Sequence, residues 1–299
     1  MEEQFNQDIE PSAVKKDGIS YDPKGEADGF FKAFHPLVQK AFNELDNYLI
    51  IDEASNTGWC CVYFSSNGIY FPSDEATFRR EILEKNRFEF YGTRLRHCSK
   101  HIFVRDIHKQ WYLQGISNRY NSIEKVAAFL KKATEGYHVI TLGSSAGGYA
   151  AALFATLINA EYAICVDAQF TLYDETIFGQ LEKNPIVSEL KGKEESKYFR
   201  LNDILGDVPV YYFCSVLSEW DRRSLESVKD NKAIRLIPFK SSKHGGPFNT
   251  IVYDYVFDLS QAELEKLTGK LHHPSLFLLR YLFHRPVLKK LWHRLRKRF

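Results

Sequence analysis

The sequence predicts an α/β fold in which a mostly parallel β-sheet is covered by helices on both faces. Short apolar stretches alternate with amphipathic or alanine-rich stretches along most of the chain. The apolar residues of the short stretches are consecutive, which is typical of parallel strands that are buried on both sides. With 299 residues, the chain is long enough to bury a substantial core.

The expected elements follow in chain order. Residues 1–30 are polar and contain several glycines and prolines, so we expect an irregular arm there, followed by an amphipathic helix between residues 31 and 49. Strands are expected at residues 48–51, 59–64, 102–104, 138–142, 163–166, 208–215 and 233–238, and helices at 74–85, 123–132 and 145–159. Residues 171–205 are more than a simple crossover needs, and their short apolar pairs suggest a small helical cap. The expected boundaries are residues 1–47 for the arm and first helix, 48–268 for the body, and 269–299 for a basic tail.

Charge is distributed unevenly along the chain. The formal net charge is +2, but residues 271–299 contain eight Lys or Arg and no Asp or Glu, so the first 270 residues carry a net charge of −6. Leucine, phenylalanine and tryptophan alternate with these basic residues, and Pro286 divides the tail into two expected amphipathic helices. Because such helices bind anionic membrane surfaces, we expect a membrane as partner. RNA, a protein partner and a solvated helix remain alternatives.

Cysteine use indicates a reducing compartment. The five cysteines are an odd number, and their spacing matches neither a disulfide framework nor a zinc site. Four of them lie in apolar stretches, where cysteine behaves as a small buried hydrophobe. The polar start predicts no signal peptide, and no stretch reaches the ~18 apolar residues of a transmembrane helix. The expected location is the cytoplasm, with the tail at the inner face of the membrane.

The strand expected at 138–142 leads directly into a G-x-S-x-G motif. Gly143, Ser145 and Gly147 form this motif, and an alanine-rich helix follows. In this strand–turn–helix context the serine sits in a strained backbone conformation, and the two glycines approach other backbone too closely for side chains. The helix N-terminus then favours negative charge, and the Ala146 N–H is one expected oxyanion donor. The alternative is a glycine-rich turn that opens a helix.

A serine nucleophile needs a base and an acid. His244 lies in a loop of small residues after the strand expected at 233–238, from which its imidazole can reach the serine. Asp221 follows the preceding strand, where a carboxylate would orient the imidazole and stabilise its charged form. Glu219 is the reserve for the acid, and Asp167, after the strand expected at 163–166, is a third candidate. A surface ion pair is the alternative role for Asp221.

Two further groups of residues are candidates for the site. Ser65 and Ser66 follow the strand expected at 59–64, and one of their N–H groups would be the second oxyanion donor. Trp111 and Tyr112 follow another strand end, where exposed aromatic rings could bind a sugar by stacking, although packing beneath the sheet is an equal alternative.

Several other functions are not supported. His97, Cys98, His101 and His108 have no spacing typical of tetrahedral metal sites, so no metal is expected. The chain has neither G-x-x-x-x-G-K-[ST] nor G-x-G-x-x-G, so nucleotide binding is not predicted, and no nucleic-acid partner is expected.

The elbow motif from Gly143 to Gly148, with Asp221 and His244 following in that order, resembles the α/β-hydrolase superfamily over about residues 48 to 268. The Gly-Ser-Ser-x-Gly-Gly elbow, the absence of a His-Gly oxyanion motif and the small cap are similar to hydrolase-like proteins of bacterial surface-polysaccharide clusters. Some of these are capsule O-acetyltransferases. The resemblance implies Ser145 as nucleophile, Asp221 as acid and His244 as base.

The expected function is acyl transfer from an ester or thioester, by an esterase or an O-acyltransferase that acts on a carbohydrate or polysaccharide ester. No bound cofactor is expected, and acetyl-CoA is a candidate acyl donor. The second hypothesis is a non-catalytic, membrane-docked assembly factor that keeps the scaffold of an enzyme.

Overall fold

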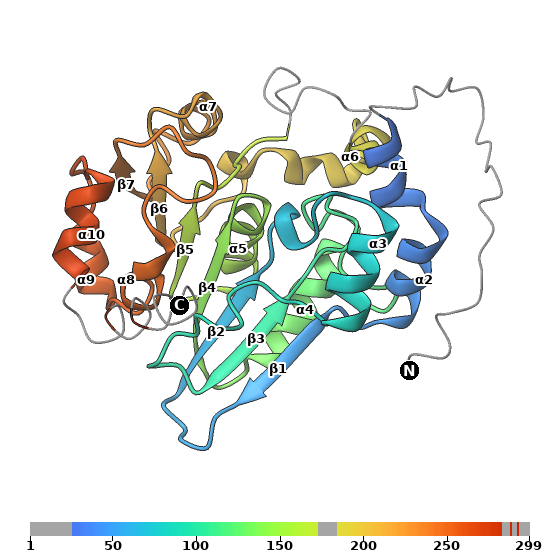
Figure 1. Ribbon diagram of the computed structural model, residues 1–299, viewed down its shortest axis with the longest axis horizontal. Coiled ribbons are helices and arrows are strands. Elements are labelled where there is room, and N and C mark those ends of the chain that lie inside the picture. The colour runs from blue at the N-terminus through green and yellow to red at the C-terminus, as the bar shows by residue number, and fades with distance from the viewer. Residues whose placement is uncertain (1–25, 173–183, 283–287, 289–291, 293–299) are drawn as a thin grey trace.

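The fold is built around one seven-stranded sheet in which six neighbouring strands run parallel (Figure 1). The computed structural model describes residues 26–172, 184–282, 288 and 292. The strands are β1 (Tyr48–Asp52), β2 (Trp59–Phe64), β3 (Lys100–Val104), β4 (His138–Ser144), β5 (Tyr162–Val166), β6 (Val210–Ser215) and β7 (Ile234–Phe239). Their order is β1-β3-β2-β4-β5-β6-β7, and only β1 is antiparallel to its neighbour, β3. The expected α/β class is confirmed.

The register of the central strands brings two loops together. Phe64, the last residue of β2, pairs with Gly143 near the end of β4. The loop that begins at Ser65 therefore lies beside the turn that contains Ser145. Both lie at the carboxyl edge of the sheet, where ligands bind in open α/β folds.

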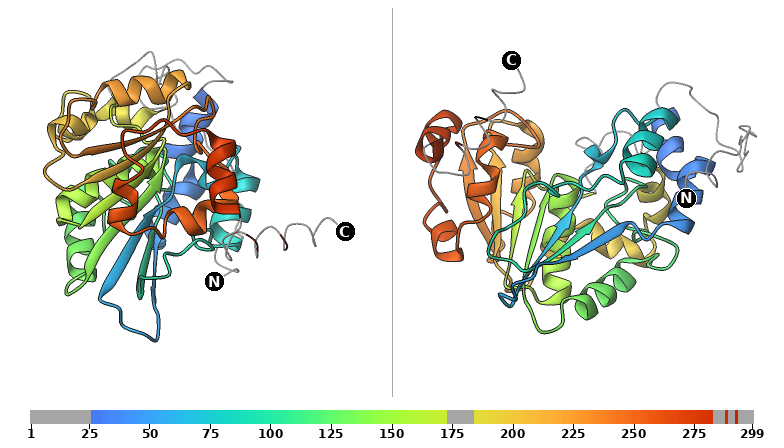
Figure 2. Two further views of the ribbon diagram at one scale, coloured as in Figure 1. Left: turned by 90° about the vertical axis from the view of Figure 1, so that its left-hand side faces the viewer. Right: turned by 60° about the horizontal axis from the view of Figure 1, so that its bottom comes forward.

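Both faces of the sheet carry helices. Cys60, Val62 and Phe64 point to one face, where α4 (Ile123–Ala133) and α5 (Ala146–Ile158) complete the larger core. Cys61 and Tyr63 point to the other face, which is covered by α8 (Tyr253–Val256), α9 (Gln261–Glu265) and α10 (Pro274–Leu282). The side view in Figure 2 shows the sheet between these two helical layers. Consecutive apolar residues are therefore buried on alternate faces, as the strand pattern predicts.

The helix expected between residues 31 and 49 is instead two helices. α1 (Glu26–Phe34) begins within the expected arm, and α2 (Pro36–Glu44) follows after His35. Proline lacks an N–H and pushes the preceding residue towards extended backbone. His35 accordingly has φ −62° and ψ 132°, and Pro36 occupies the first turn of α2. The spacing of the apolar residues continues unchanged across Pro36, so the spacing alone does not reveal the break between the two helices.

The remaining helices complete the fold. α3 (Glu75–Phe78) continues into a π-helical segment, η2 (Arg79–Glu84). The part of the expected cap that is described contains α6 (Pro185–Leu190), η4 (Glu194–Phe199) and η5 (Leu201–Asp203); α7 (Glu219–Glu226) follows β6, and η6 (Thr250–Val252) precedes α8. Residues 1–25, 173–183 and most of the tail beyond Leu282, Pro286 included, lie outside the described residues. Among the described helices, none has the length and apolar character needed to cross a membrane.

Two glycines allow α5 to approach its neighbours closely. A Cβ on Gly143 would lie 2.1 Å from the Gly147 carbonyl oxygen, and a Cβ on Gly147 would lie 2.3 Å from the Phe64 carbonyl oxygen. These atoms belong to backbone, which cannot move aside as the end of a side chain can. Gly143 and Gly147 therefore both lie too close to other backbone atoms for a side chain, as the elbow motif predicts.

We predict that Gly147→Ala lowers the free energy of unfolding by about 1–3 kcal/mol, because the methyl group would force β2 and α5 apart. Urea denaturation measures the change. Gly92→Ala is the control, since a Cβ at Gly92 would meet nothing within 4 Å. Equal stability of Gly147→Ala and the unmodified protein would contradict the close contact.

Candidate active site

The turn between β4 and α5 presents Ser145 in a strained conformation. Its φ of 53° and ψ of −120° lie outside the regions that side-chain-bearing residues favour. The Ser145 N–H donates to the Val166 carbonyl oxygen at 2.9 Å, which fastens the turn to the end of β5. α5 begins at the next residue, so its N-terminus is directed at the serine. This is the geometry that the elbow motif predicts.

The structure brings Ser145 and His244 together across 99 residues of sequence. The Ser145 Oγ lies 3.0 Å from His244 Nε2. His244 stands in the loop after β7, and its side chain is 35% exposed. The pair is therefore hydrogen-bonded and open to solvent, which a site that receives a substrate requires.

Asp221 holds the other nitrogen of the same imidazole. Its Oδ1 lies 2.7 Å from His244 Nδ1, and its side chain is only 1% exposed. An ionised carboxylate only accepts hydrogen bonds, so Nδ1 carries the proton and Nε2 is free to accept from the Ser145 hydroxyl. Ser218 caps the N-terminus of α7 and thereby sets the position of Asp221 in its first turn. Glu219, the reserve for the acid, instead forms an ion pair with Arg223.

Asp167 is a second buried acid behind His244. It is fully buried at the end of β5, with φ 41°. Its carboxylate accepts the N–H of Ser215, at the end of β6, and the N–H of Gly246, in the His244 loop, both at 2.8 Å. Asp167 thus joins two strand ends to the loop that carries the imidazole. In the sequence, the signal for Asp167 is its position directly after an expected strand.

The two acids and the imidazole influence one another. Oxygen atoms of Asp167 and Asp221 and a nitrogen of His244 lie within 4.8 Å of one another. Burial, followed by the negative charge of Asp221, raises the pKa of Asp167 to about 7. Burial lowers the pKa of His244, but the hydrogen bond to Asp221 and the charges of both acids outweigh it, so the net shift is upward. Asp221 Oδ2 is buried and has no hydrogen-bond partner among the described residues.

Of the three N–H groups expected to bind the oxyanion, two already have acceptors in the structure. Ala146 begins α5, and its N–H has no acceptor among the described residues. The Ser65 N–H, however, donates to the Val104 carbonyl oxygen at 2.9 Å, which continues the pairing of β2 with β3. The Ser66 N–H donates to the Glu89 carboxylate at 2.8 Å, as does the Ser66 hydroxyl. Neither serine offers a free N–H in this structure, so the assignment of the second donor to Ser65 or Ser66 needs correction.

Glu89 was not foreseen from the sequence. It lies in an irregular segment 23 residues after Ser66, and no motif surrounds it. Burial raises the pKa of Glu89, while the two hydrogen bonds from Ser66 lower it. The Ser66 N–H can serve an oxyanion only when this carboxylate moves away.

The interpretation of Trp111 and Tyr112 as an exposed sugar platform is wrong. Trp111 is 4% exposed and Tyr112 is 1% exposed, because their rings pack in the core between the sheet and α5. The Tyr112 hydroxyl lies 2.8 Å from the Ser65 carbonyl oxygen, and the Trp111 indole N–H donates to Gln169 at 2.6 Å. Through these hydrogen bonds, the two buried residues hold the loops that follow β2 and β5 in place.

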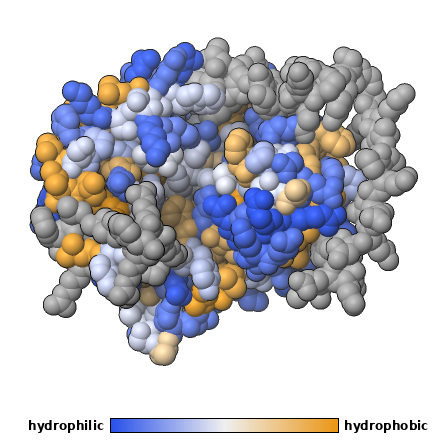
Figure 3. All heavy atoms as spheres, in the orientation of Figure 1, coloured by the Kyte–Doolittle hydropathy of each residue, from blue (hydrophilic) through white to orange (hydrophobic). Residues whose placement is uncertain are grey.

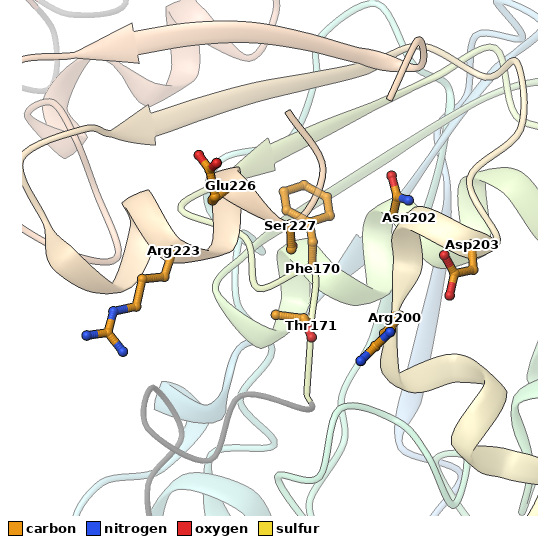
Figure 4. A pocket seen from close by; sticks show the side chains of 8 residues that line it. All are labelled: Phe170, Thr171, Arg200, Asn202, Asp203, Arg223, Glu226 and Ser227. Atoms are coloured by element: carbon orange, nitrogen blue, oxygen red, sulfur yellow. The ribbon is translucent and has the colours of Figure 1, made fainter. Parts of the chain in front are cut away.

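A cavity of about 510 Å³ lies beside α7, and none of the three hydrogen-bonded residues lines it (Figure 4). Most of the residues that line it are polar or charged, with both signs of charge present: Phe170, Thr171, Arg200, Asn202, Asp203, Arg223, Glu226 and Ser227. Phe170 follows the same strand as Asp167, and Arg223 is on the same helix as Asp221. The cavity thus adjoins the elements that hold the imidazole in place.

The histidines considered for a metal make separate contacts. His97 Nδ1 lies 3.0 Å from Asp258, His101 Nδ1 lies 3.0 Å from the Tyr63 hydroxyl, and His108 is stacked on Phe42. Within the described residues, metal-ligand atoms come close together at Asp167, Asp221 and His244. Both nitrogens of His244 already have partners there, so the arrangement suits proton transfer.

Comparison with known proteins identifies the fold. No protein-family model matches the chain, and no curated protein matches it in sequence. Among solved structures, the capsule O-acetyltransferase of Neisseria meningitidis serogroup A has a TM-score of 0.51 at 17% identity, over 74% of this chain and 92% of that chain. A mutant of that enzyme in complex with CoA has a TM-score of 0.49 at 14% identity, over 73% and 98% of the two chains.

Acetyl xylan esterase 1 from Thermoanaerobacterium sp. has a TM-score of 0.43 at 10% identity, over 74% of this chain and 78% of that chain. Of these three structures, the first has a TM-score above 0.5. Because its sequence is 17% identical to this chain, the similarity establishes the fold and not the activity. The chain has the α/β-hydrolase fold. Its fold is similar to that of the meningococcal capsule O-acetyltransferase.

We predict that Asp167→Asn lowers the pKa of His244. A negative carboxylate favours the imidazolium, and a neutral amide does not, so the difference is present above pH 7, where Asp167 is ionised. NMR titration of the imidazole measures it. The exposed Asp230→Asn is the control and should leave the pKa of His244 unchanged. An unchanged pKa in Asp167→Asn would show that Asp167 exerts no electrostatic influence on the imidazole.

Proposed function

We propose that this protein is a serine-dependent acyl-transfer enzyme, an esterase or O-acyltransferase, with Ser145 as nucleophile, His244 as base and Asp221 as orienting acid. The observation that carries the proposal is the hydrogen-bonded series from the Ser145 Oγ through the imidazole to Asp221. A serine and a histidine that only lay on the surface would not need a buried carboxylate hydrogen-bonded to the imidazole. The same series in this order is what nucleophilic catalysis by serine requires.

In the first half of the reaction, the Ser145 oxygen attacks the carbonyl carbon of an ester or thioester. His244 Nε2 accepts the hydroxyl proton, and Asp221 stabilises the imidazolium that forms. The tetrahedral intermediate then loses its alkoxide or thiolate, which takes the proton from His244. The product is an acyl group bonded to Ser145.

In the second half, a hydroxyl group of water or of a sugar attacks this acyl-serine. His244 accepts the proton of that hydroxyl and returns it to the Ser145 oxygen when the carbon–oxygen bond breaks. Attack by water gives an esterase, and attack by a sugar gives an O-acyltransferase. In both halves the Ala146 N–H, at the N-terminus of α5, stabilises the oxyanion.

The cavity beside α7 supports a polar, phosphate-bearing donor such as acetyl-CoA. Arg200 and Arg223 line it together with Thr171 and Asn202, and the carboxylates of Asp203 and Glu226 line it as well. Arg223 is also paired with Glu219, which leaves Arg200 as the cation that the donor proposal tests. Guanidinium groups bind phosphate in a bidentate manner, and hydroxyl and amide groups supply further hydrogen bonds. The likeness to a capsule O-acetyltransferase is consistent with an acetyl donor.

A carbohydrate acceptor is the corresponding proposal for the second half-reaction. Trp220 precedes Asp221 on α7 and is 49% exposed. An exposed indole on the helix that carries Asp221 can stack on the apolar face of a sugar ring. A surface polysaccharide is a polymer of such rings, and its hydroxyl groups are the nucleophiles that acetylation consumes.

We predict that a fluorophosphonate probe labels the unmodified protein at Ser145. Labelling should disappear in Ser145→Ala and fall by about a thousandfold or more in His244→Ala, because the hydroxyl loses its base. Ser242→Ala, which removes an exposed hydroxyl two residues before His244, should be labelled normally. Gel fluorescence and mass spectrometry measure the outcome. A protein that the probe does not label would not be a serine enzyme of this kind.

For the donor, we predict that Arg200→Ala raises KM for acetyl-CoA by about tenfold, since a charged hydrogen bond to phosphate is lost. KM for p-nitrophenyl acetate, which has no phosphate, should stay the same. Arg235→Ala on β7 is the control for loss of an arginine elsewhere. Steady-state kinetics with both substrates measure the effect, and equal KM values for acetyl-CoA would exclude this cavity as the donor site.

A further inference from the structure

The start of the basic tail is anchored to the body of the protein. The His272 N–H donates to the Pro238 carbonyl oxygen, and the Lys240 N–H donates to the His272 carbonyl oxygen, both at 2.8 Å. These bonds fasten the tail to β7, the edge strand of the sheet. Phe277 and Tyr281 of α10 are then buried, at 3% and 4% exposure. The helix is therefore a fixed part of the structure as far as its last described turn.

The opposite face of α10 is apolar and uncovered. Leu276 is 64% exposed and Leu279 is 56% exposed, and Leu271, just before the helix, is 56% exposed. Hydrophobic residues gather at the left-hand edge of Figure 3, where Figure 1 draws α10. An ordinary surface helix has one apolar face, and that face is already used here by Phe277 and Tyr281. The second apolar face needs an occupant outside the folded body.

The charge of the same segment indicates what that occupant is. Residues 271–299 carry eight basic side chains and no acidic one. Two further described residues of the tail, Leu288 and Trp292, are also exposed, at 42% and 55%. A second copy of this chain would present the same positive charge and be repelled. Nucleic acid would match the charge but not the exposed leucines.

We propose that the exposed face of α10, with the basic residues that follow it, docks the protein on an anionic lipid surface. The leucines enter the boundary between headgroups and acyl chains, and the basic side chains contact the headgroups. This proposal goes beyond the acyl-transfer activity and does not depend on it. It gives the protein a location at a membrane surface.

The test uses the full-length protein and sedimentation with vesicles. We expect binding to vesicles of phosphatidylglycerol mixed with phosphatidylcholine, no binding to phosphatidylcholine alone, and weaker binding as salt concentration rises. The double variant Leu276→Gln and Leu279→Gln should bind about tenfold or more weakly, because two side chains no longer leave water on binding. The matched control is Leu217→Gln, which removes an equally exposed leucine beside α7 and should bind as the unmodified protein does.

A second pair of substitutions tests the charge. Lys289→Gln with Lys290→Gln should weaken binding by about tenfold or more and reduce its dependence on salt, since each basic residue contributes to attraction by the lipid. Thermal denaturation and fluorophosphonate labelling of each variant show that the fold and the serine site are intact. The proposal is overturned if anionic vesicles do not bind the protein at low salt, if the leucine variant binds as tightly as the unmodified protein, or if RNA competes fully with the vesicles.

Discussion

The backbone of Ser145 is the constraint on which the rest of the site depends. A residue with a side chain at positive φ costs about 1–2 kcal/mol, so this conformation persists only where its surroundings enforce it. Here β4 enters the turn from the centre of the sheet, the Ser145 N–H is bonded to β5, and α5 leaves it as a helix whose residues 146–155 are all buried. The favourable burial of α5 offsets the local strain. The same geometry exposes the hydroxyl and directs the helix N-terminus at it.

The histidine is held by a different means. Its loop contains small and polar residues. Two buried carboxylates hold it, one directly after β5 and the other in the first turn of α7. Asp221 bonds the imidazole itself, and Asp167 bonds the Gly246 N–H two residues further along. Burial, and after it the negative charge of the neighbouring Asp221 carboxylate, raises the pKa of Asp167 to about 7. The charge behind the imidazole is therefore sensitive to pH near neutrality.

Much of the fold followed from local pattern. Each expected strand is present with its ends shifted by no more than two residues, because consecutive apolar residues bounded by polar turns define a buried strand whatever its neighbours are. The sequence also singled out the serine, the histidine and the acid that the structure joins by hydrogen bonds, since each follows a strand and all such ends meet at one edge of the sheet. The break at Pro36 was missed, although the proline itself was the signal. Burial of Trp111 could not be read, because an aromatic residue after a strand has the same local pattern whether it faces solvent or the core.

The sequence by itself determined the α/β class, the strained turn at Ser145 and the chain order of the three hydrogen-bonded residues. These features depend on residue type and on neighbours within a few positions, which the sequence contains. Only the tertiary structure decided which N–H groups remain free, which of two acids touches the imidazole, and which face of α10 is covered. Each of these depends on a contact between segments far apart in the chain, such as Glu89 with Ser66 or Asp167 with Gly246. Such contacts depend on how distant segments pack together, and local sequence pattern does not carry that information.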